Sequence, residues 1–248
     1  MKTIILIIVP ILSVILINGC TKEPCEVKTN QVSTNGNIFT IGNKSYYVDV
    51  TTLDSAIEIS AMVHSYTSKK FDIDKDGILD FELYSDYSIS PGGINYQKSM
   101  IKVLNPIFHI STIKMSDTLY KCKQITNDTI VTYTIYNNYS NFSCNGIKTT
   151  FSPNIYTYPK VYSKGDSLTY NESWINKDLI LSFNDRSAFI FGHPSITIHS
   201  IIRGNWNNKN LKYLLFKKEY NGKNYYGWLK LSICCYSGIR LYEYAIQK

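Results

Sequence analysis

Apolar and polar residues alternate along most of this chain. In residues 56–63 the alternation places Ile57, Ile59, Ala61 and Val63 on one face of an extended segment, because successive side chains of a strand point to opposite faces. The same pattern predicts further strands at residues 46–50, 81–83, 101–109 with an interruption at Pro106, 130–136, 179–183, 196–202, 211–216, 227–233 and 239–244. We find no stretch of a dozen residues with the period of about 3.6 that marks an amphipathic helix. The pattern therefore predicts an all-β protein.

Turn residues between these segments indicate how the strands are organised. Gly, Asn, Asp and Ser separate them, and Asn221-Gly222 is the dipeptide most typical of a two-residue hairpin. Many short strands with such turns are typical of a sandwich or jelly roll, and the chain lacks the repeats that a propeller needs. We expect a single β-sandwich domain, jelly-roll-like, over residues 37–248, after a polar tether at residues 20–36.

Residues 1–19 differ from the rest in composition, since Lys2 is followed by an apolar run over residues 4–17. This run is shorter than the roughly 20 residues of a transmembrane helix, and a basic residue before a short apolar region is typical of an export signal. Residues 17–20, Ile-Asn-Gly-Cys, resemble the lipobox of bacterial lipoproteins. The resemblance implies that residues 1–19 are a signal peptide and that Cys20 becomes the acylated first residue. The alternative is an ordinary secretory signal with a chance cysteine near its end.

The lipoprotein resemblance also implies a location. Acyl chains such as palmitate on Cys20 would anchor the protein to a membrane, because each buried methylene contributes about 0.8 kcal/mol and stable anchoring takes more than one chain. We expect the outer membrane of the cell envelope. Lys22-Glu23 resembles a surface-export tag of some Gram-negative lipoproteins, and a solvated tether is the alternative.

Composition and charge narrow the classes of molecule that the protein could bind. Hydrophobic residues make up 44% and charged residues 18% of the chain, which describes a globular protein. The formal net charge is +7, and removal of Lys2 with the leader leaves +6. The basic residues are scattered and form no stripe or nucleic-acid-binding module. We therefore expect no nucleic-acid partner.

The cysteines other than Cys20 are candidates for disulfides, because such bonds persist outside the cytoplasm. These candidates are Cys25, Cys122, Cys144, Cys234 and Cys235. Cys122 and Cys144 flank an expected hairpin, and closing that loop would stabilise the fold by about 3 kcal/mol. Cys25 could pair with Cys234 or Cys235, which leaves one thiol over. Connectivity does not follow from sequence alone.

Residues 71–81, Phe-Asp-Ile-Asp-Lys-Asp-Gly-Ile-Leu-Asp-Phe, hold the densest group of carboxylates in the chain. Calcium binds roughly six to eight oxygens, and the spacing follows the start of an EF-hand loop with Gly77 at its sharp bend. Leu83 takes the closing position of that loop and has no side-chain oxygen, so an earlier aspartate must close the site. The expected ligands are the carboxylates and one carbonyl of Asp72, Asp74, Asp76, Ile78 and Asp80.

This segment resembles the short Asp-x-Asp-x-Asp-Gly-x-x-Asp calcium loops of exported bacterial and extracellular β-rich proteins, which lead directly into a strand. The alternative is a solvated turn, since Asp and Gly are ordinary turn residues. Four regularly spaced aspartates repel one another unless a cation neutralises them. We therefore expect a structural calcium ion.

Three segments, residues 164–168, 224–231 and 239–245, resemble parts of uncharacterised exported bacterial β-sandwich proteins. Those proteins pair an Asp-rich loop with a C-terminal hairpin that carries Tyr-Gly-Trp-x-x-Leu, here residues 226–231. The resemblance implies a structural role for Trp228 in the core or at the sandwich edge, and it implies no activity.

The chain carries no nucleophile elbow, zinc-protease helix or phosphate-binding loop, and we expect no particular catalytic residue. The leading hypothesis is a non-enzymatic module that binds or scaffolds a glycan or an envelope protein, with a purely structural envelope component as a further reading. The alternative is a surface glycan-active hydrolase with unidentified catalytic carboxylates, for which Asp166, Glu172, Asp178 and Asp185 are available. Exposed tyrosines together with Trp206 could stack on sugar rings.

Overall fold

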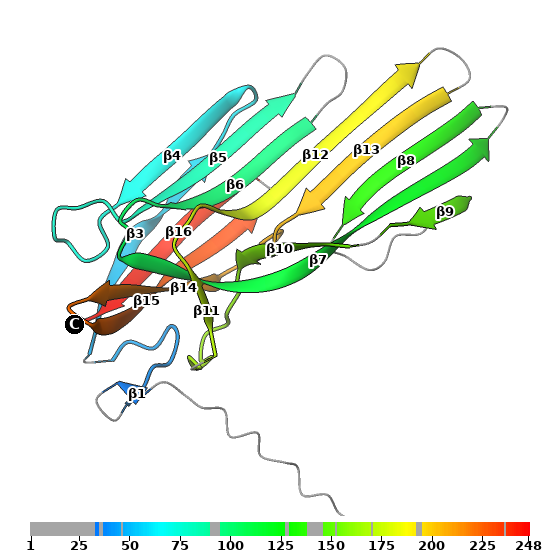
Figure 1. Cartoon of the computed structure of the whole chain (residues 1–248). Coiled ribbons are helices and arrows are strands. Elements are labelled where there is room, and N and C mark those ends of the chain that lie inside the picture. Colours follow the sequence, from blue (N-terminus) through cyan, green and yellow to red (C-terminus); the bar gives the residue numbers. More distant parts are fainter. Residues whose placement is uncertain are drawn as a thin grey trace, which may run out of the picture. The chain divides into compact units, whose positions relative to one another are not determined.

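The computed structural model describes residues 33–34, 37–45, 47–89, 95–126, 129–137, 146–151, 153–169, 171–191, 195–235 and 237–248. Within these ranges the chain forms strands and no helix (Figure 1). The described part therefore contains no helix that could span a membrane. The predicted all-β class is confirmed. The expected signal peptide and Cys20 lie outside the described residues.

The strands account for most of the described chain. They are β1 (Ser33–Thr34), β2 (Asn37–Ile38), β3 (Val48–Ser60), β4 (Ser65–Phe71), β5 (Phe81–Ile89), β6 (Asn95–Val103), β7 (Phe108–Thr126), β8 (Thr129–Asn137), β9 (Ile147–Thr150), β10 (Asn154–Pro159), β11 (Ser173–Ile175), β12 (Leu179–Phe191), β13 (Ser195–Arg203), β14 (Lys212–Tyr220), β15 (Lys223–Cys234) and β16 (Gly238–Gln247). The short strands β1 and β2 pair with each other.

Two sheets pack face to face and share the long strand β7 (Figure 1). The first sheet has the order β3-β16-β15-β14-β7, and β10 and β11 also pair with the first half of β7. The second sheet has the order β4-β5-β6-β12-β13-β8-β7, and β9 pairs with the second half of β7. Neighbouring strands are antiparallel except β8 and β13, which are parallel. The predicted single β-sandwich is therefore confirmed.

The main core lies between the sheets. Phe81 of β5 lies with its ring centroid 5.2 Å from those of both Phe108 and Phe216, which belong to the opposite sheet. Such aromatic contacts add about 0.5–1.5 kcal/mol to the burial of apolar area. The other buried members of this cluster are Ile59, Phe71, Ile73, Leu83, Ile101, Ile110, Leu179, Leu181, Trp206, Leu214, Leu229, Leu231, Ile233, Ile239, Leu241 and Ile246.

A second apolar cluster covers the opposite face of the first sheet. Tyr213, Leu215 and Trp228 point into it, and residues 39–41 and 162–168 lie over them. Strands β14 and β15 are therefore buried on both faces, which explains their continuous apolar runs. The expected core position of Trp228 is confirmed, since its side chain is fully buried.

The bounds of some elements differ from the predicted ones. The segments expected at 46–50 and 56–63 belong largely to one strand, β3. The interruption expected at Pro106 is confirmed, because β6 ends at Val103 and a turn through Asn105-Pro106 precedes β7. Proline has no N–H for a ladder and restricts the residue before it, so the strand stops there. The Asn221-Gly222 hairpin is confirmed, with φ of +51° and +71° as a two-residue turn requires.

Candidate metal site

The acidic loop joins β4 to β5 at one end of the sandwich. Phe71 and Phe81 pair across the base of the loop, and the Asp80 N–H donates to the Phe71 carbonyl at 2.8 Å. Both phenylalanines are buried in the main core. Asp72 and Asp80 are therefore held at the two sides of a loop whose base is fixed by the sheet.

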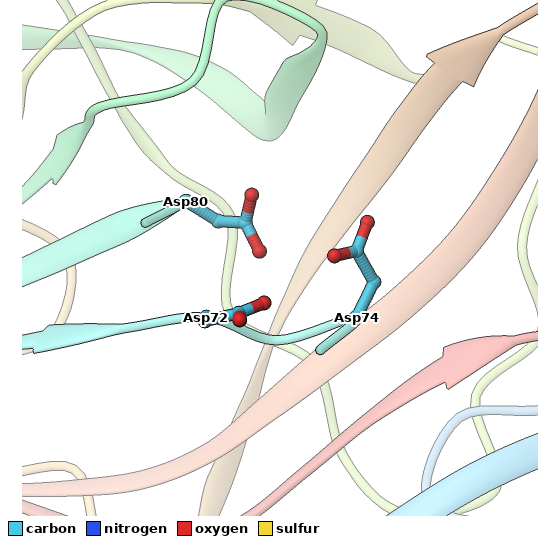
Figure 2. Close-up of side chains that lie close together, drawn as sticks. All are labelled: Asp72, Asp74 and Asp80. Atoms are coloured by element: carbon cyan, nitrogen blue, oxygen red, sulfur yellow. The ribbon is translucent and has the colours of Figure 1, made fainter. Parts of the chain in front are cut away.

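Three carboxylates of the loop converge. Asp72, Asp74 and Asp80 each place one oxygen within 4.8 Å of the others, and Figure 2 shows the three groups gathered around a common space. Ligands of one calcium ion, each about 2.3–2.6 Å from it, lie at such separations. These three residues could hold a metal ion.

Backbone hydrogen bonds fold the loop around this space. The Gly77 N–H donates to Asp72 Oδ2 at 2.8 Å, and the Asp76 N–H donates to Asp74 Oδ1 at 3.3 Å. Lys75 and Gly77 have φ of +63° and +90°, left-handed values that turn the chain sharply. The loop is thus shaped by its own aspartates, which place their carboxylates on its inner side.

Asp80 is the most buried of the three carboxylates. It is fully buried, and it accepts hydrogen bonds from the Ile73 N–H at 2.8 Å and from Asn105 Nδ2 at 3.0 Å. Burial raises the pKa of Asp80 to about 6, and the charges of Asp74 and Asp76 add to the rise, while the two hydrogen bonds oppose it. The loop thus concentrates negative charge where water does not fully screen it.

One oxygen of the site has no partner. Asp72 Oδ1 is buried from water and makes no hydrogen bond, whereas Asp72 Oδ2 is engaged by the Gly77 N–H. A buried carboxylate oxygen without a partner is costly. A cation in the space shared by the three carboxylates would satisfy Asp72 Oδ1.

Lys218 of β14 brings a positive charge to the loop. Its ammonium group contacts Asp74 Oδ2 and lies 3.7 Å from Asp76 Oδ2. Burial alone would lower the pKa of Lys218, but the hydrogen bond and the charges of the neighbouring aspartates raise it. Lys218 therefore offsets part of the charge that the loop accumulates.

Of the other two predicted ligands, Asp76 is outside this group and the Ile78 carbonyl stays a prediction. Asp76 lies outside the group of three, and its Oδ1 accepts the Ile78 N–H at 2.8 Å. Ile78 is exposed. Sequence reasoning missed Asn105 and Lys218. Asn105-Pro106 is a visible turn signal, but nothing in the sequence pairs it with Asp80.

The cysteines divide into two groups. Cys122 is disulfide-bonded, and its expected partner Cys144 lies outside the described residues, as does Cys25. The pairing of Cys122 with Cys144 stays a prediction. Cys234 and Cys235 are free and exposed.

The structure bears on two expectations about sugar binding and hydrolysis. Stacking of Trp206 on a sugar ring is wrong, because the side chain is fully buried in the main core. Glu172 is bound by Lys160 Nζ at 2.8 Å and by Thr169 Oγ1 at 3.1 Å. Asp166 accepts the Ser163 N–H at 2.7 Å in a turn. Both carboxylates are thus held by hydrogen bonds within the fold.

No protein-family model, curated protein or solved structure matches this chain. The resemblances to the lipobox and to the Tyr-Gly-Trp hairpin stay predictions.

Proposed function

We propose that this protein is a lipid-anchored β-sandwich of the cell envelope that binds glycans without catalysis, and that a calcium ion stabilises its acidic loop. The observation that carries the calcium proposal is the convergence of Asp72, Asp74 and Asp80. Carboxylate oxygens are the ligands that calcium prefers, and water can complete its coordination. The unpartnered Asp72 Oδ1 is a second observation in its favour.

The calcium proposal is tested by thermal unfolding of the mature chain in chelator and in calcium. Calcium sites of extracellular modules have dissociation constants of about 10⁻⁴–10⁻³ M. A calcium concentration 100 times the dissociation constant stabilises the folded state by about 2.7 kcal/mol. For a domain of this size the midpoint should rise by roughly 5–10 °C. A midpoint that is the same in chelator and calcium would refute the proposal.

Two asparagine variants of the same loop sharpen this test. In Asp72→Asn the amide oxygen can still accept the Gly77 N–H, but the charge at the shared space is lost. Asp76→Asn makes the same change outside the group of three. We expect the calcium response to disappear in the first variant and to persist in the second. Equal responses in the two variants would show that the converging carboxylates do not form the site.

The anchor proposal rests on the sequence of residues 17–20 alone. Metabolic labelling with a palmitate analogue should mark the wild-type protein in the membrane fraction and leave Cys20→Ala unlabelled. Cys25→Ala is the matched control, because it removes a cysteine from the same segment and should keep the label. Label on Cys20→Ala would contradict the lipoprotein assignment.

A glycan is favoured as ligand by an aromatic face on the second sheet. Tyr66 is 71% exposed and stacks on Tyr84, with 5.9 Å between ring centroids. Tyr96 contacts Phe183 edge-on at 5.4 Å. The strand register places all four rings on one face. Leu83, the neighbour of Tyr84, is buried in the core, so the aromatic face points away from it.

Binding to immobilised peptidoglycan and to purified lipopolysaccharide tests the glycan proposal. Truncation of an aromatic anchor typically costs more than about 1 kcal/mol, so Tyr66→Ala should bind at least about fivefold more weakly. Tyr220→Ala removes another exposed tyrosine, at 53% exposure in β14, and should bind as the wild type does. Absence of binding by the wild type, or equal loss in both variants, would contradict the role of this face.

A further inference from the structure

Two adjacent cysteines, Cys234 and Cys235, lie where β15 ends and the chain turns towards β16. Both are exposed, and their Sγ atoms are 2.9 Å apart. Cys234 pairs with Gly238 as the last rung of the hairpin. The two thiols therefore face each other at the surface of a fixed turn.

The backbone explains why neighbouring side chains meet here. Consecutive residues of a regular strand point to opposite faces, which would keep the two sulfurs apart. Cys235 instead has φ of +54°, a left-handed value that residues other than glycine rarely adopt. The Ser237 N–H donates to the Cys235 carbonyl at 2.8 Å, which links Cys235 to the residue before β16. The turn thus brings Cys235 Sγ to the side of Cys234 Sγ.

The turn is also tied to the second sheet. Ser85 of β5 donates its hydroxyl to the Ser237 carbonyl, and the same hydroxyl accepts the Ala61 N–H at 3.2 Å. Ser85 is fully buried. These bonds keep the turn in place, so the two thiols are held close to each other before any reaction. Holding two reacting groups in contact raises their effective concentration.

We propose that Cys234 and Cys235 form a redox site that closes reversibly to a disulfide between adjacent residues. The site is independent of the calcium loop and of the aromatic face. Its oxidant is a small disulfide or a disulfide exchange protein of the compartment in which the protein resides.

The reaction consists of two thiol–disulfide exchanges. The contact with Cys234 raises the pKa of Cys235. Because the two Sγ atoms are in contact, either thiol can begin the exchange, and Cys234 is taken as the first nucleophile. Cys234 loses its proton, attacks one sulfur of the external disulfide and expels a thiolate, which takes up a proton. Cys235 then loses its proton and attacks Cys234 Sγ, and the second external thiol leaves. One disulfide has formed, one has been reduced to two thiols, and no other electron acceptor is needed.

Adjacency makes this disulfide labile. The Cα atoms of neighbouring residues are about 3.8 Å apart across a trans peptide, whereas disulfides usually join Cα atoms about 4.4–6.8 Å apart. The ring is therefore strained. Strained and exposed disulfides are more easily reduced than structural ones and are the regulatory or catalytic kind. The pair should respond to the redox poise of its surroundings, while the disulfide of Cys122 should not.

Mass spectrometry of one tryptic peptide tests the proposal. Residues 231–240 follow Lys230, end at Arg240 and contain Cys234 and Cys235 as their only cysteines. The mature chain is equilibrated with graded ratios of reduced to oxidised glutathione, alkylated with iodoacetamide and digested. We expect the peptide to lack two hydrogens and carry no alkyl group at oxidising ratios. At reducing ratios it should carry two alkyl groups.

Three results would overturn the proposal. Two alkyl groups at every ratio would show that the pair does not oxidise. A cross-link to the peptide of residues 23–28 would show that Cys25 is the partner instead. Reduction of the pair only at ratios that also reduce the disulfide of Cys122 would show that it is a structural bond.

One serine variant, Cys235→Ser, provides the matched control. In Cys235→Ser the mixed disulfide on Cys234 has no adjacent thiol to resolve it. This variant should therefore accumulate one glutathione on the peptide, whereas the wild type should carry none at equilibrium. Equal glutathione adducts in the wild type and the variant would contradict the second exchange.

Discussion

The ammonium group of Lys218 contacts the carboxylate of Asp74, although 144 positions separate the two residues along the chain. Asp74 belongs to the loop between two strands of the second sheet, and Lys218 belongs to β14 of the first sheet. The contact therefore joins the acidic loop to the opposite layer of the sandwich. It also places a permanent cation beside the space where we propose that calcium binds.

Replacing Lys218 should strengthen calcium binding and weaken the calcium-free protein. Lys218→Met removes a competing cation that is only 14% exposed. We expect the calcium dissociation constant to fall by about tenfold, which corresponds to about 1.4 kcal/mol. The calcium-free midpoint should fall as well, because Asp74 loses its partner. Calorimetric titration and thermal unfolding in chelator measure the two effects.

Lys217→Met is the matched control for this prediction. Lys217 directly precedes Lys218. Its side chain has the same 14% exposure, and it pairs with Glu219 away from the loop. Its replacement should leave calcium affinity unchanged. An equal gain in calcium affinity in both variants would show that the gain comes from the change in net charge and not from the position of Lys218.

The half-buried pair of Glu172 and Lys160 should make stability depend on pH in the acid range. Burial alone would raise the pKa of Glu172, but hydrogen bonds from Lys160 and Tyr162 outweigh it and lower the pKa below its ordinary 4.5. The charged form is thus favoured in the folded state. The contribution of the charged Glu172 to the free energy of unfolding is present above pH 4.5. It is lost as the pH falls through the lowered pKa.

Glu172→Gln tests this dependence. A hydrogen bond to a charged group contributes about 1.5–3 kcal/mol, so the variant should be less stable by about that amount at pH 7. The difference should shrink as the pH falls below 4.5, because the wild-type carboxylate becomes protonated. Urea unfolding at both pH values measures it. A difference that stays constant with pH would contradict the assignment.

Two glycines of the C-terminal hairpin should respond very differently to alanine. At Gly227 an added Cβ would lie 2.3 Å from the Ala245 carbonyl oxygen and from the Phe216 ring. At Gly222 it would meet nothing within 4 Å, but φ is +71°. Gly227→Ala should therefore cost about 3 kcal/mol or more, and Gly222→Ala about 1–2 kcal/mol. Equal losses in urea unfolding would contradict the close packing of β15 on β16.

Arg203 should stabilise the fold mainly by neutralising the buried carboxylate of Asp117. Asp117 in β7 is fully buried, accepts a hydrogen bond from the Tyr158 hydroxyl at 2.9 Å, and lies 3.2 Å from Arg203 Nε. Removing one partner of a buried ion pair costs about 3–5 kcal/mol. Arg203→Met should lose that much, and the double variant with Asp117→Asn should recover part of it. Additive losses in a double-mutant cycle would contradict the coupling.

Local patterns predicted the parts of this fold that depend on neighbours in sequence. Asn221-Gly222 identified its hairpin because only residues that tolerate positive φ fit that turn. The strand β4 was missed because it lies at an edge of the second sheet, where only Phe71 is buried. Its exposed polar residues hide the alternation on which strand prediction depends.

The candidate site was likewise predicted only where it depends on neighbours in sequence. Aspartates spaced two apart could be read as ligands, because their positions in one turn are set locally. Asn105 reaches the loop from the turn before β7, and Lys218 reaches it from β14. No short segment of the sequence shows which distant elements will lie side by side. Trp206 was assigned to the surface for a related reason, since aromatic residues occur both in cores and at surfaces.

The pairing of β3 with β16 has a consequence for assembly. These are the first and last long strands, and they pair along most of their lengths. β16 is synthesised long after β3, and joining them closes a loop that contains nearly the whole domain. Such distant pairings slow folding. The first sheet therefore cannot acquire its outer strand until β16 has been synthesised, and a chain cut short before residue 238 would leave β3 without its neighbour.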